Sequence, residues 1–265
     1  MLVYGTAWKE DRTEALTTLA LASGFRAIDT ANQRKHYNEA GVGAALARAK
    51  LPRDQLFLQT KFTHVHSQDA RLPYDPAAPI ATQVEQSCAS SLDHLGTSYL
   101  DSYVLHGPST THGLAPQDVE AWQAIETLHD RGVAHRIGIS NVTVDQLEQV
   151  CGLARVQPAF VQNRCYASMG WDARVRELCR ARGIVYQGFS LLTANRRELA
   201  HPVVDEVMAR NGMTRAQVVF SFALRVGMMP LTGTSNEAHM REDLAVLERT
   251  LPDPDVQRIE RIAVQ

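Results

Sequence analysis

The sequence predicts an α/β protein, a (β/α)8 TIM barrel that forms one domain over residues 1–265. Eight short apolar runs, rich in β-branched residues, have the pattern of buried strands. Between them lie longer stretches with apolar residues three or four positions apart, the spacing of amphipathic helices. The length of 265 residues matches the roughly 250 that such a barrel needs.

The expected elements alternate along the whole chain. Strands are expected at residues 2–5, 26–29, 56–61, 100–106, 134–139, 159–162, 185–189 and 228–232. Helices are expected at residues 13–23, 39–49, 81–95, 116–131, 144–151, 172–182, 215–225 and 237–247. Pro116 favours a helix start, Thr143 and Gln146 have the spacing of a capping box, and Gly96 follows a helix end.

This alternation predicts a parallel sheet with right-handed crossovers. Eight units favour a closed barrel, and an open sheet is the alternative. The first strand-to-helix turn lacks the GxGxxG pattern of dinucleotide-binding open sheets. Residues 63–79 and 191–213 exceed the usual loop length, and the second segment is expected to contain an extra helix near 203–210. Residues 252–264 have the pattern of a final helix.

Composition limits the classes of partner. The formal net charge is −2, so no broad positive field is expected to attract nucleic acid or an anionic membrane. The longest apolar runs fall short of the ~20 residues that span a bilayer, and the N-terminus lacks signal-peptide architecture. The cysteines Cys88, Cys151, Cys165 and Cys179 form no CxxC pair, which favours a reduced, cytoplasmic location. No long apolar surface stripe is visible, so a monomer or weak oligomer is expected.

Polar side chains stand where the predicted strands end. Asp29, Lys61 and His106 end the second, third and fourth strands, and Tyr37 follows the second. In a (β/α)8 barrel the active site forms at these carboxyl ends, so the four side chains are expected to converge. Taken singly, Asp29 is equally a helix cap, Lys61 a surface residue and His106 a core histidine.

Together these groups can form a proton-transfer device for carbonyl reduction. A tyrosine has a pKa of roughly 10, and a neighbouring lysine ammonium is expected to lower it. Asp29 would hold Lys61 charged and in place. His106 would donate a hydrogen bond to the carbonyl oxygen.

Several segments resemble the aldo-keto reductases, and together they cover nearly the whole chain. The strand ends are similar in GFRAIDTA (24–31), LFLQTKF (56–62) and LDSYVLHGP (100–108), and NEAGVGAAL (38–46) resembles the helix after the catalytic tyrosine. IGISN (137–141), VQNRCY (161–166) and GTSNEAHMREDL (233–244) resemble the cofactor-binding segments. The resemblance implies an NAD(P)H-dependent oxidoreductase that reduces aldehydes or ketones on a short barrel without the long C-terminal loop.

The resemblance also implies a role for each site residue. Tyr37 would be the general acid, Asp29 and Lys61 its tuners, and His106 the orienting residue. The implied cofactor is NADPH first and NADH second. The residues implied to bind it are Ser140, Asn141, Gln162 and Phe189 at the nicotinamide, Ser190 and Leu192 along the pyrophosphate, and Gly233, Thr234, Ser235, His239, Glu242 and Asp243 at the adenosine end. Backbone N–H groups at a helix start have a physical basis for binding phosphate.

The sequence departs from the family pattern around the tyrosine. The usual Asp-to-Tyr spacing is five residues, a position that Arg34 occupies here, whereas Tyr37 follows Asp29 by eight. We interpret the run ANQRKHY as an insertion that still delivers Tyr37. His36 is the rival proton donor and a candidate for substrate binding. Arg34 and Lys35 are either substrate contacts or parts of a solvated loop.

A second departure concerns the cofactor. NADP-binding members often place a lysine and an arginine around the 2′-phosphate, where this chain has Gly233 and His239. Arg241 or the Arg196–Arg197 pair are candidates to compensate.

The third departure is the short chain, which leaves few segments to contact a small carbonyl substrate. Trp8, Phe62, the 63–79 segment and the region after His106 are the candidates. Gly107 stands where the family often has a bulky aromatic residue, so a wider pocket is expected.

Two other functions are alternatives. His64 and His66 form an HxH pair near His106, as in metal-dependent barrel hydrolases, but the pair lies inside a loop, and the favoured interpretation needs no metal. A regulatory or redox-sensing protein that binds cofactor and turns over slowly is the other alternative, and the altered tyrosine spacing supports it.

Overall fold

The computed structural model describes residues 1–263, and its strands form a closed barrel. They follow one another in chain order from β1 to β8, which confirms the predicted fold class. The strands are β1 (Val3–Gly5), β2 (Ala27–Asp29), β3 (Phe57–Phe62), β4 (Ser102–Leu105), β5 (Ile137–Ser140), β6 (Phe160–Arg164), β7 (Val185–Phe189) and β8 (Met228–Thr232).

Ten α-helices are described. They are α1 (Thr13–Ser23), α2 (Glu39–Ala49), α3 (Ile80–Leu95), α4 (Pro116–Asp130), α5 (Val144–Leu153), α6 (Ala173–Arg182), α7 (Pro202–Asn211), α8 (Arg215–Arg225), α9 (Glu237–Leu244) and α10 (Asp253–Glu260). Every expected helix is present, with ends that differ by a few residues. The final helix was expected to reach Val264, which lies outside the described residues. The capping box at Thr143 and Gln146 is confirmed, because each side chain accepts a hydrogen bond from the other's backbone N–H.

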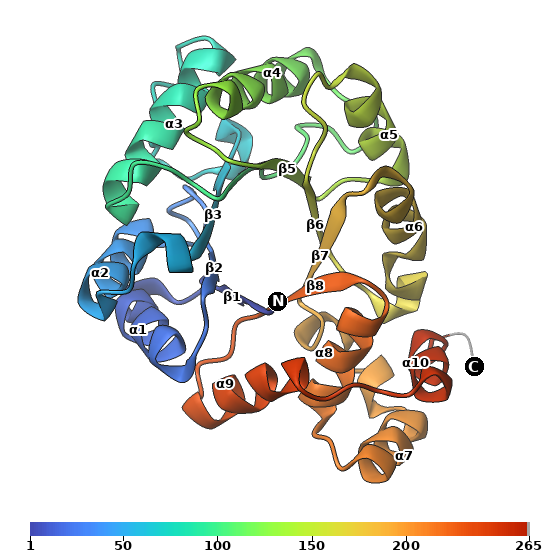
Figure 1. Cartoon of the computed structure of the whole chain (residues 1–265). Coiled ribbons are helices and arrows are strands. Elements are labelled where there is room, and N and C mark those ends of the chain that lie inside the picture. The colour runs from blue at the N-terminus through green and yellow to red at the C-terminus, as the bar shows by residue number, and fades with distance from the viewer. Residues whose placement is uncertain (264–265) are drawn as a thin grey trace. The chain divides into compact units, whose positions relative to one another are not determined.

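The chain divides into two compact units. The N-terminal unit is Tyr4–Val161, and the C-terminal unit is Gln162–Gln265 with Met1–Val3. In the N-terminal unit, β2, β3, β4 and β5 pair in parallel, and α1 to α4 lie outside these strands (Figure 1). All six residues of β3 are buried, as expected of a parallel strand covered on both faces.

The alternation of side chains along β3 sets the position of the site. Successive residues of a strand point to opposite faces. Lys61 therefore points to the same face as Gln59, while Thr60 and Phe62 point toward the helices. Thr60 donates a 2.5 Å hydrogen bond to the buried carboxylate of Glu39 in α2, which fixes the strand against that helix.

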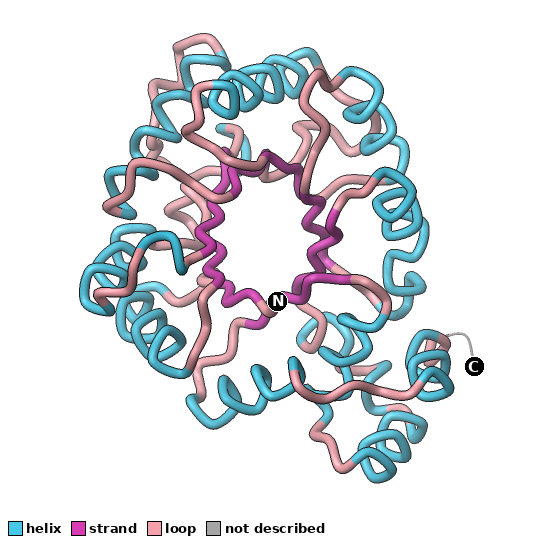
Figure 2. The backbone as a smooth tube through the Cα atoms, in the orientation of Figure 1, coloured by secondary structure: helices cyan, strands magenta, loops and turns pink. Residues whose placement is uncertain are grey.

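The C-terminal unit is organised around β7 and β8, which pair in parallel (Figure 2). The ring of Trp171 packs against Phe222 of α8, with centroids 5.0 Å apart. Its indole N–H also donates to the Ile259 carbonyl oxygen at 3.1 Å, which ties α10 to this core. The long segment after β7 contains α7, as the sequence predicted.

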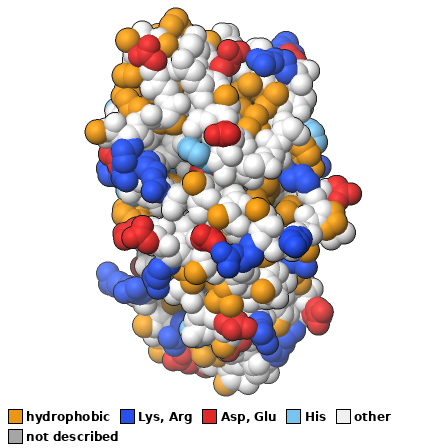
Figure 3. Space-filling model, turned by 90° about the vertical axis from the view of Figure 1, so that its left-hand side faces the viewer, with side chains coloured by type: hydrophobic (Ala, Val, Ile, Leu, Met, Phe, Trp, Pro, Cys, Tyr) orange, Lys and Arg blue, Asp and Glu red, His pale blue; other side chains and the backbone are white. Residues whose placement is uncertain are grey.

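The surface carries charges of both signs. Basic and acidic side chains are interspersed with apolar ones on the face shown in Figure 3. Among the described residues, no helix combines the length and apolar character needed to cross a membrane. All four cysteines are buried free thiols.

Candidate functional site

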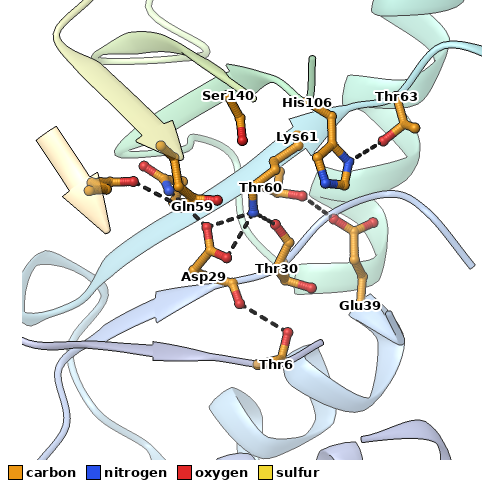
Figure 4. Close-up of polar contacts among 12 residues, drawn as sticks. Thr6, Asp29, Thr30, Glu39, Gln59, Thr60, Lys61, Thr63, His106 and Ser140 are labelled. Carbon is orange, nitrogen blue, oxygen red and sulfur yellow. Dashed lines mark hydrogen bonds and ion pairs between the residues drawn. The ribbon is translucent and has the colours of Figure 1, made fainter. Parts of the chain in front are cut away.

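A buried ion pair lies at the centre of the site, between the ends of β2 and β3. The Lys61 ammonium donates to both oxygens of Asp29, at 2.7 and 2.8 Å, and to the Thr30 carbonyl oxygen at 2.7 Å (Figure 4). The two side chains are 0% and 4% exposed. Gln59 also donates to Asp29, at 2.8 Å. These contacts use all three ammonium donors, so both charges are compensated inside the protein.

The charge state of Lys61 depends on this compensation. Burial lowers the pKa of Lys61, because an ammonium loses its hydration. The charge and hydrogen bond of Asp29 act in the opposite direction and raise that pKa. Asp29 therefore favours the charged form of Lys61 at a buried position that would otherwise favour the neutral amine.

Tyr37 lies beside this pair, on the loop between β2 and α2. The Lys61 nitrogen is 5.4 Å from the centroid of the Tyr37 ring, and the His106 ring meets that ring edge-on at 5.9 Å. The loop forms a turn in which the N–H groups of His36 and Tyr37 donate to the Gln33 carbonyl oxygen, both at 3.0 Å. Tyr37 thereby lies close to Lys61 and His106.

The phenol of Tyr37 stays protonated in this state. Burial raises its pKa above the ordinary value, and the charge of Asp29 raises it further. The expectation of a lowered Tyr37 pKa is therefore wrong. The reason is that a buried phenolate would lose its hydration and would lie near the Asp29 carboxylate. The three Lys61 donors are directed at Asp29 and Thr30. A protonated phenol is the form that can deliver a proton.

His106 follows β4 and is held on both its backbone and its ring. Its N–H donates to the Phe62 carbonyl oxygen at 2.8 Å, and its Nδ1 lies 2.6 Å from the Thr63 hydroxyl. Burial lowers the pKa of His106 to about 3, assisted by the Lys61 charge, so the imidazole is neutral at physiological pH. A neutral imidazole can donate one hydrogen bond to a substrate.

Ser140 and Asn141 stand at the end of β5 in the same unit. Ser140 is buried, whereas Asn141 is exposed and has a left-handed φ of 55°, a conformation that asparagine tolerates. The Asn141 amide nitrogen donates to the His106 carbonyl oxygen at 2.8 Å and to the Ser140 hydroxyl at 3.1 Å. A hydroxyl beside a side-chain amide is a donor and acceptor set that suits a carboxamide ligand.

The candidate substrate residues differ in accessibility. Trp8 is 66% exposed, and its ring lies against that of His36 in a tilted arrangement, with centroids 3.9 Å apart. The Nδ1 atom of His36 is 2.8 Å from Gln33 Oε1, and burial lowers the His36 pKa. Phe62 has no exposed surface and packs on Tyr74, so the structure does not favour the direct substrate contact expected of it. Its position in the strand turns it toward the helices.

The cofactor candidates of the C-terminal unit considered first lie in β6 and β7 or directly after β7. Gln162 is buried in β6 and donates to Gln187 at 3.0 Å. Phe189 ends β7, and both it and Ser190 are partly exposed, the latter with a left-handed φ of 57°. Leu192 is also partly exposed.

The segment after β8 is open to solvent. Gly233, Ser235 and His239 are exposed, and Thr234 and Glu242 partly so. The Asn236 side chain caps α9 by accepting from the His239 N–H at 3.1 Å. Arg241 forms an ion pair with Glu237.

Asp243 differs from its neighbours because it is buried. Its carboxylate accepts a 2.7 Å hydrogen bond from Thr232, and burial raises its pKa to about 6. Of the candidate cations for a 2′-phosphate, Arg196 and Arg197 are exposed.

The HxH pair has a structural environment of its own. His64 Nε2 lies 3.0 Å from Asp118 Oδ1, and the His64 and His66 rings stack with centroids 5.8 Å apart. Asp118 also accepts from the N–H groups of Ser109 and Ala115, both at 2.8 Å. Across residues 1–263, no group of three or more His, Cys, Asp or Glu side chains is arranged to hold a metal ion.

Sequence reasoning missed three polar partners of the central residues. Gln59 and Thr30 complete the surroundings of the ion pair, and Thr63 contacts His106. Two of them could have been found from strand alternation, because Gln59, Lys61 and Thr63 are spaced by two and therefore share a face. The Thr30 contact uses a carbonyl group, which no sequence pattern marks.

Comparisons with known proteins identify the family. The family model described as "Aldo/keto reductase family" matches residues 2–264. The chain is 29% identical to an NAD/NADP-dependent indole-3-acetaldehyde reductase of Schizosaccharomyces pombe, over 98% of this chain and 90% of that protein. It is 31% identical to an aldo-keto reductase of Mycolicibacterium paratuberculosis, over 95% and 81%.

Solved structures show the same fold. An aldo/keto reductase from Brucella melitensis superposes with a TM-score of 0.84 at 25% identity, covering 98% of this chain and 94% of that one. The deep-sea metagenome enzyme MGS-M4 superposes with a TM-score of 0.85 at 20% identity, covering 98% and 90%, and supports the fold alone. The chain is therefore an oxidoreductase that belongs to the aldo/keto reductase family.

Proposed function

We propose that this protein is an NAD(P)H-dependent carbonyl reductase in which Tyr37 is the proton donor. The observation that carries the proposal is the buried Lys61–Asp29 pair, with the Tyr37 ring 5.4 Å from the ammonium. A bound reduced nicotinamide would supply the hydride to the carbonyl carbon. Family membership supports this reaction class.

Tyr37, Lys61 and His106 have different roles in the proposed reaction. The phenol of Tyr37 donates its proton to the carbonyl oxygen as negative charge develops there. The Lys61 charge stabilises the resulting phenolate through space, because its hydrogen bonds are already directed at Asp29 and Thr30. His106 orients the carbonyl by a hydrogen bond from its ring, and its neutral state avoids a second cation beside Lys61.

The cofactor assignments made from the family resemblance are part of this proposal. Ser140, Asn141 and Gln162 would bind the carboxamide, and Phe189 would stack on the nicotinamide ring. Ser190 and the segment 233–243 would contact the phosphates and the adenosine. NADPH is the proposed first cofactor, and NADH the second. The name of the fission yeast relative carries both cofactors, which supports testing both.

The surroundings of Trp8 and His36 bear on the substrate class. The exposed Trp8 ring, which contacts His36, favours a small aldehyde or ketone with an apolar or planar group. The relative that is named for an aldehyde with an indole ring supports the same starting panel. We further propose that the chain acts in the cytoplasm as one domain, as a monomer or weak oligomer.

The test combines binding and turnover. The purified protein is titrated with NADPH and with NADH by fluorescence quenching, and a panel of aliphatic and aromatic carbonyls is then screened by loss of reduced-cofactor absorbance. Oxidation of the cofactor that depends on the carbonyl supports the proposal. Tight binding without turnover on any carbonyl would favour the regulatory alternative, and no binding of either cofactor would overturn both.

A further inference from the structure

The contact between Thr63 and His106 is short and partly buried. The Thr63 hydroxyl lies 2.6 Å from His106 Nδ1, and Thr63 is only 2% exposed (Figure 4). Thr63 is the first residue beyond β3 and lies on the same face as Lys61. The Thr63 hydroxyl therefore contacts the imidazole of His106, which follows the neighbouring strand β4.

This contact decides which ring nitrogen carries the proton. A hydroxyl has one hydrogen, and a buried hydroxyl needs an acceptor for it. Within residues 1–263, the only hydrogen-bond partner recorded for the Thr63 hydroxyl is His106 Nδ1. If Nδ1 were protonated, both groups would have a hydrogen to donate and the Thr63 hydrogen would be left without an acceptor. The hydroxyl therefore donates, Nδ1 accepts, and Nε2 carries the proton of the neutral ring.

Thr63 is itself held in place by the segment that follows it. Its carbonyl oxygen accepts a 2.7 Å hydrogen bond from the buried Tyr74 hydroxyl. The next residue, His64, is buried and lies 3.0 Å from Asp118 at the start of α4. The contacts of Tyr74 and His64 restrict movement of the Thr63 backbone. The direction of the Thr63 hydroxyl therefore does not depend on a bound ligand.

We propose that Thr63 is a positioning residue that fixes His106 as the Nε2–H tautomer, with its donor on the side of the ring away from Thr63. This inference rests on the proposed function, because it assigns a direction to the hydrogen bond from His106 to a substrate carbonyl. The opposite tautomer would present a lone pair to the carbonyl oxygen, which repels it. A wrong tautomer is a known way to lose catalysis while geometry is kept.

The tautomer can be measured without any substrate. The nitrogen shifts of ¹⁵N-labelled histidine distinguish a protonated ring nitrogen from an unprotonated one, and the His106 signals among the ten histidines are assigned by their loss in His106→Gln. We expect Nδ1 unprotonated and Nε2 protonated in the free protein at neutral pH. A protonated Nδ1, or averaged shifts from two tautomers, would overturn the proposal.

Two substitutions connect the tautomer to turnover. Thr63→Val keeps the shape but removes the hydroxyl, and Thr63→Ser keeps the hydroxyl. We expect Thr63→Val to lower kcat about 10²-fold, the usual loss for one preorganised donor, with cofactor affinity unchanged. We expect Thr63→Ser to retain kcat within about threefold. Loss of activity in Thr63→Val with His106 still in the Nε2–H form, or equal loss in both variants, would contradict the role.

The two measurements separate this inference from the function on which it rests. If Thr63→Val does not fold, the spectrum of the unaltered protein still decides the tautomer. A protein that reduces no carbonyl but shows the Nε2–H form would refute the reaction and leave the Thr63 contact intact.

Discussion

The ends of β2 to β4 and the segment after β8 are both expected to contact ligands, yet they are built in opposite ways. At the ends of β2 to β4, Asp29 and Lys61 are buried and every ammonium donor is used. Beyond β8, His239 and most of its neighbours are exposed, and hydrogen bonds such as that of Asn236 to the His239 N–H are local.

The difference matches the two tasks. Groups that stabilise charge in a transition state are effective when they are fixed before the substrate arrives. Side chains that bind the charged, flexible end of a cofactor can stay exposed until the cofactor itself supplies their hydrogen-bond partners. Changes at the strand ends should therefore cost much in rate or stability, and changes in the exposed segment should shift affinity by small factors.

The largest effect is expected from Tyr37→Phe, which removes only the proton donor. We expect kcat to fall by about 10²- to 10⁴-fold, the range for one general acid, with cofactor affinity unchanged. Steady-state kinetics and fluorescence titration measure the two quantities. Tyr99→Phe is the matched control, because Tyr99 stacks on His135, outside the proposed site. If His36→Ala is the inactive variant and Tyr37→Phe is not, the proton donor is His36.

The next effect concerns stability. Asp29→Asn leaves the Lys61 ammonium buried without its anion, and we expect a loss of about 3–5 kcal/mol in the free energy of unfolding by urea. The exposed Arg48–Glu14 pair provides the comparison, with side chains 68% and 40% exposed. Arg48→Ala should cost no more than about 1 kcal/mol. Equal losses in the two variants would show that the central pair is not compensated as described.

A smaller effect, with a distinct pH dependence, is expected at Asp243. Its folded pKa of about 6 lies above the unfolded value of 3.8, because burial disfavours the carboxylate. The stabilisation by the protonated form is therefore complete below about pH 4 and is lost as the pH rises past about 6. Asn mimics the protonated carboxyl, so Asp243→Asn should exceed the parent in stability by about 1–3 kcal/mol at pH 8 and match it near pH 4. Urea unfolding at both pH values measures this difference, and a variant less stable than the parent at pH 8 would contradict it.

The smallest effect is expected in the exposed segment. His239→Arg places a permanent cation at the proposed adenosine end of the cofactor site, and we expect NADPH to bind about 10-fold more tightly. NADH lacks the 2′-phosphate and serves as the internal control, with unchanged affinity. Titration of both cofactors measures the effect. Equal gains for the two cofactors would mean that residue 239 does not face the 2′-phosphate.

The sequence predicted the position of the central ion pair but not all of its hydrogen bonds. Strand alternation and strand ends placed Asp29, Lys61 and His106 together, because the carboxyl ends of parallel strands share one rim. The same reasoning did not predict that Thr30 and Asp29 would use all the donors of Lys61. Burial and the nearby Asp29 charge raise the pKa of Tyr37, and neither effect can be read from the sequence pattern.

Phe62 shows a second limit. Its place beside Lys61 made it a pocket candidate, although adjacent strand residues point to opposite faces. The run ANQRKHY (31–37) posed a different problem, because spacing alone left Tyr37 and His36 as rival proton donors. The turn closed by the Gln33 carbonyl oxygen places the Tyr37 ring 5.4 Å from the Lys61 nitrogen, while the His36 ring lies against Trp8.

We expect a hydride to pass from the cofactor to a carbonyl carbon while Tyr37 delivers the proton. A reaction with NADPH deuterated at the transferred position, followed by mass analysis of the alcohol, measures this transfer. We expect one deuterium on the carbinol carbon, in a product that Tyr37→Phe forms much more slowly. An alcohol without the label, or equal rates for the two proteins, would show that the proposed reaction is wrong.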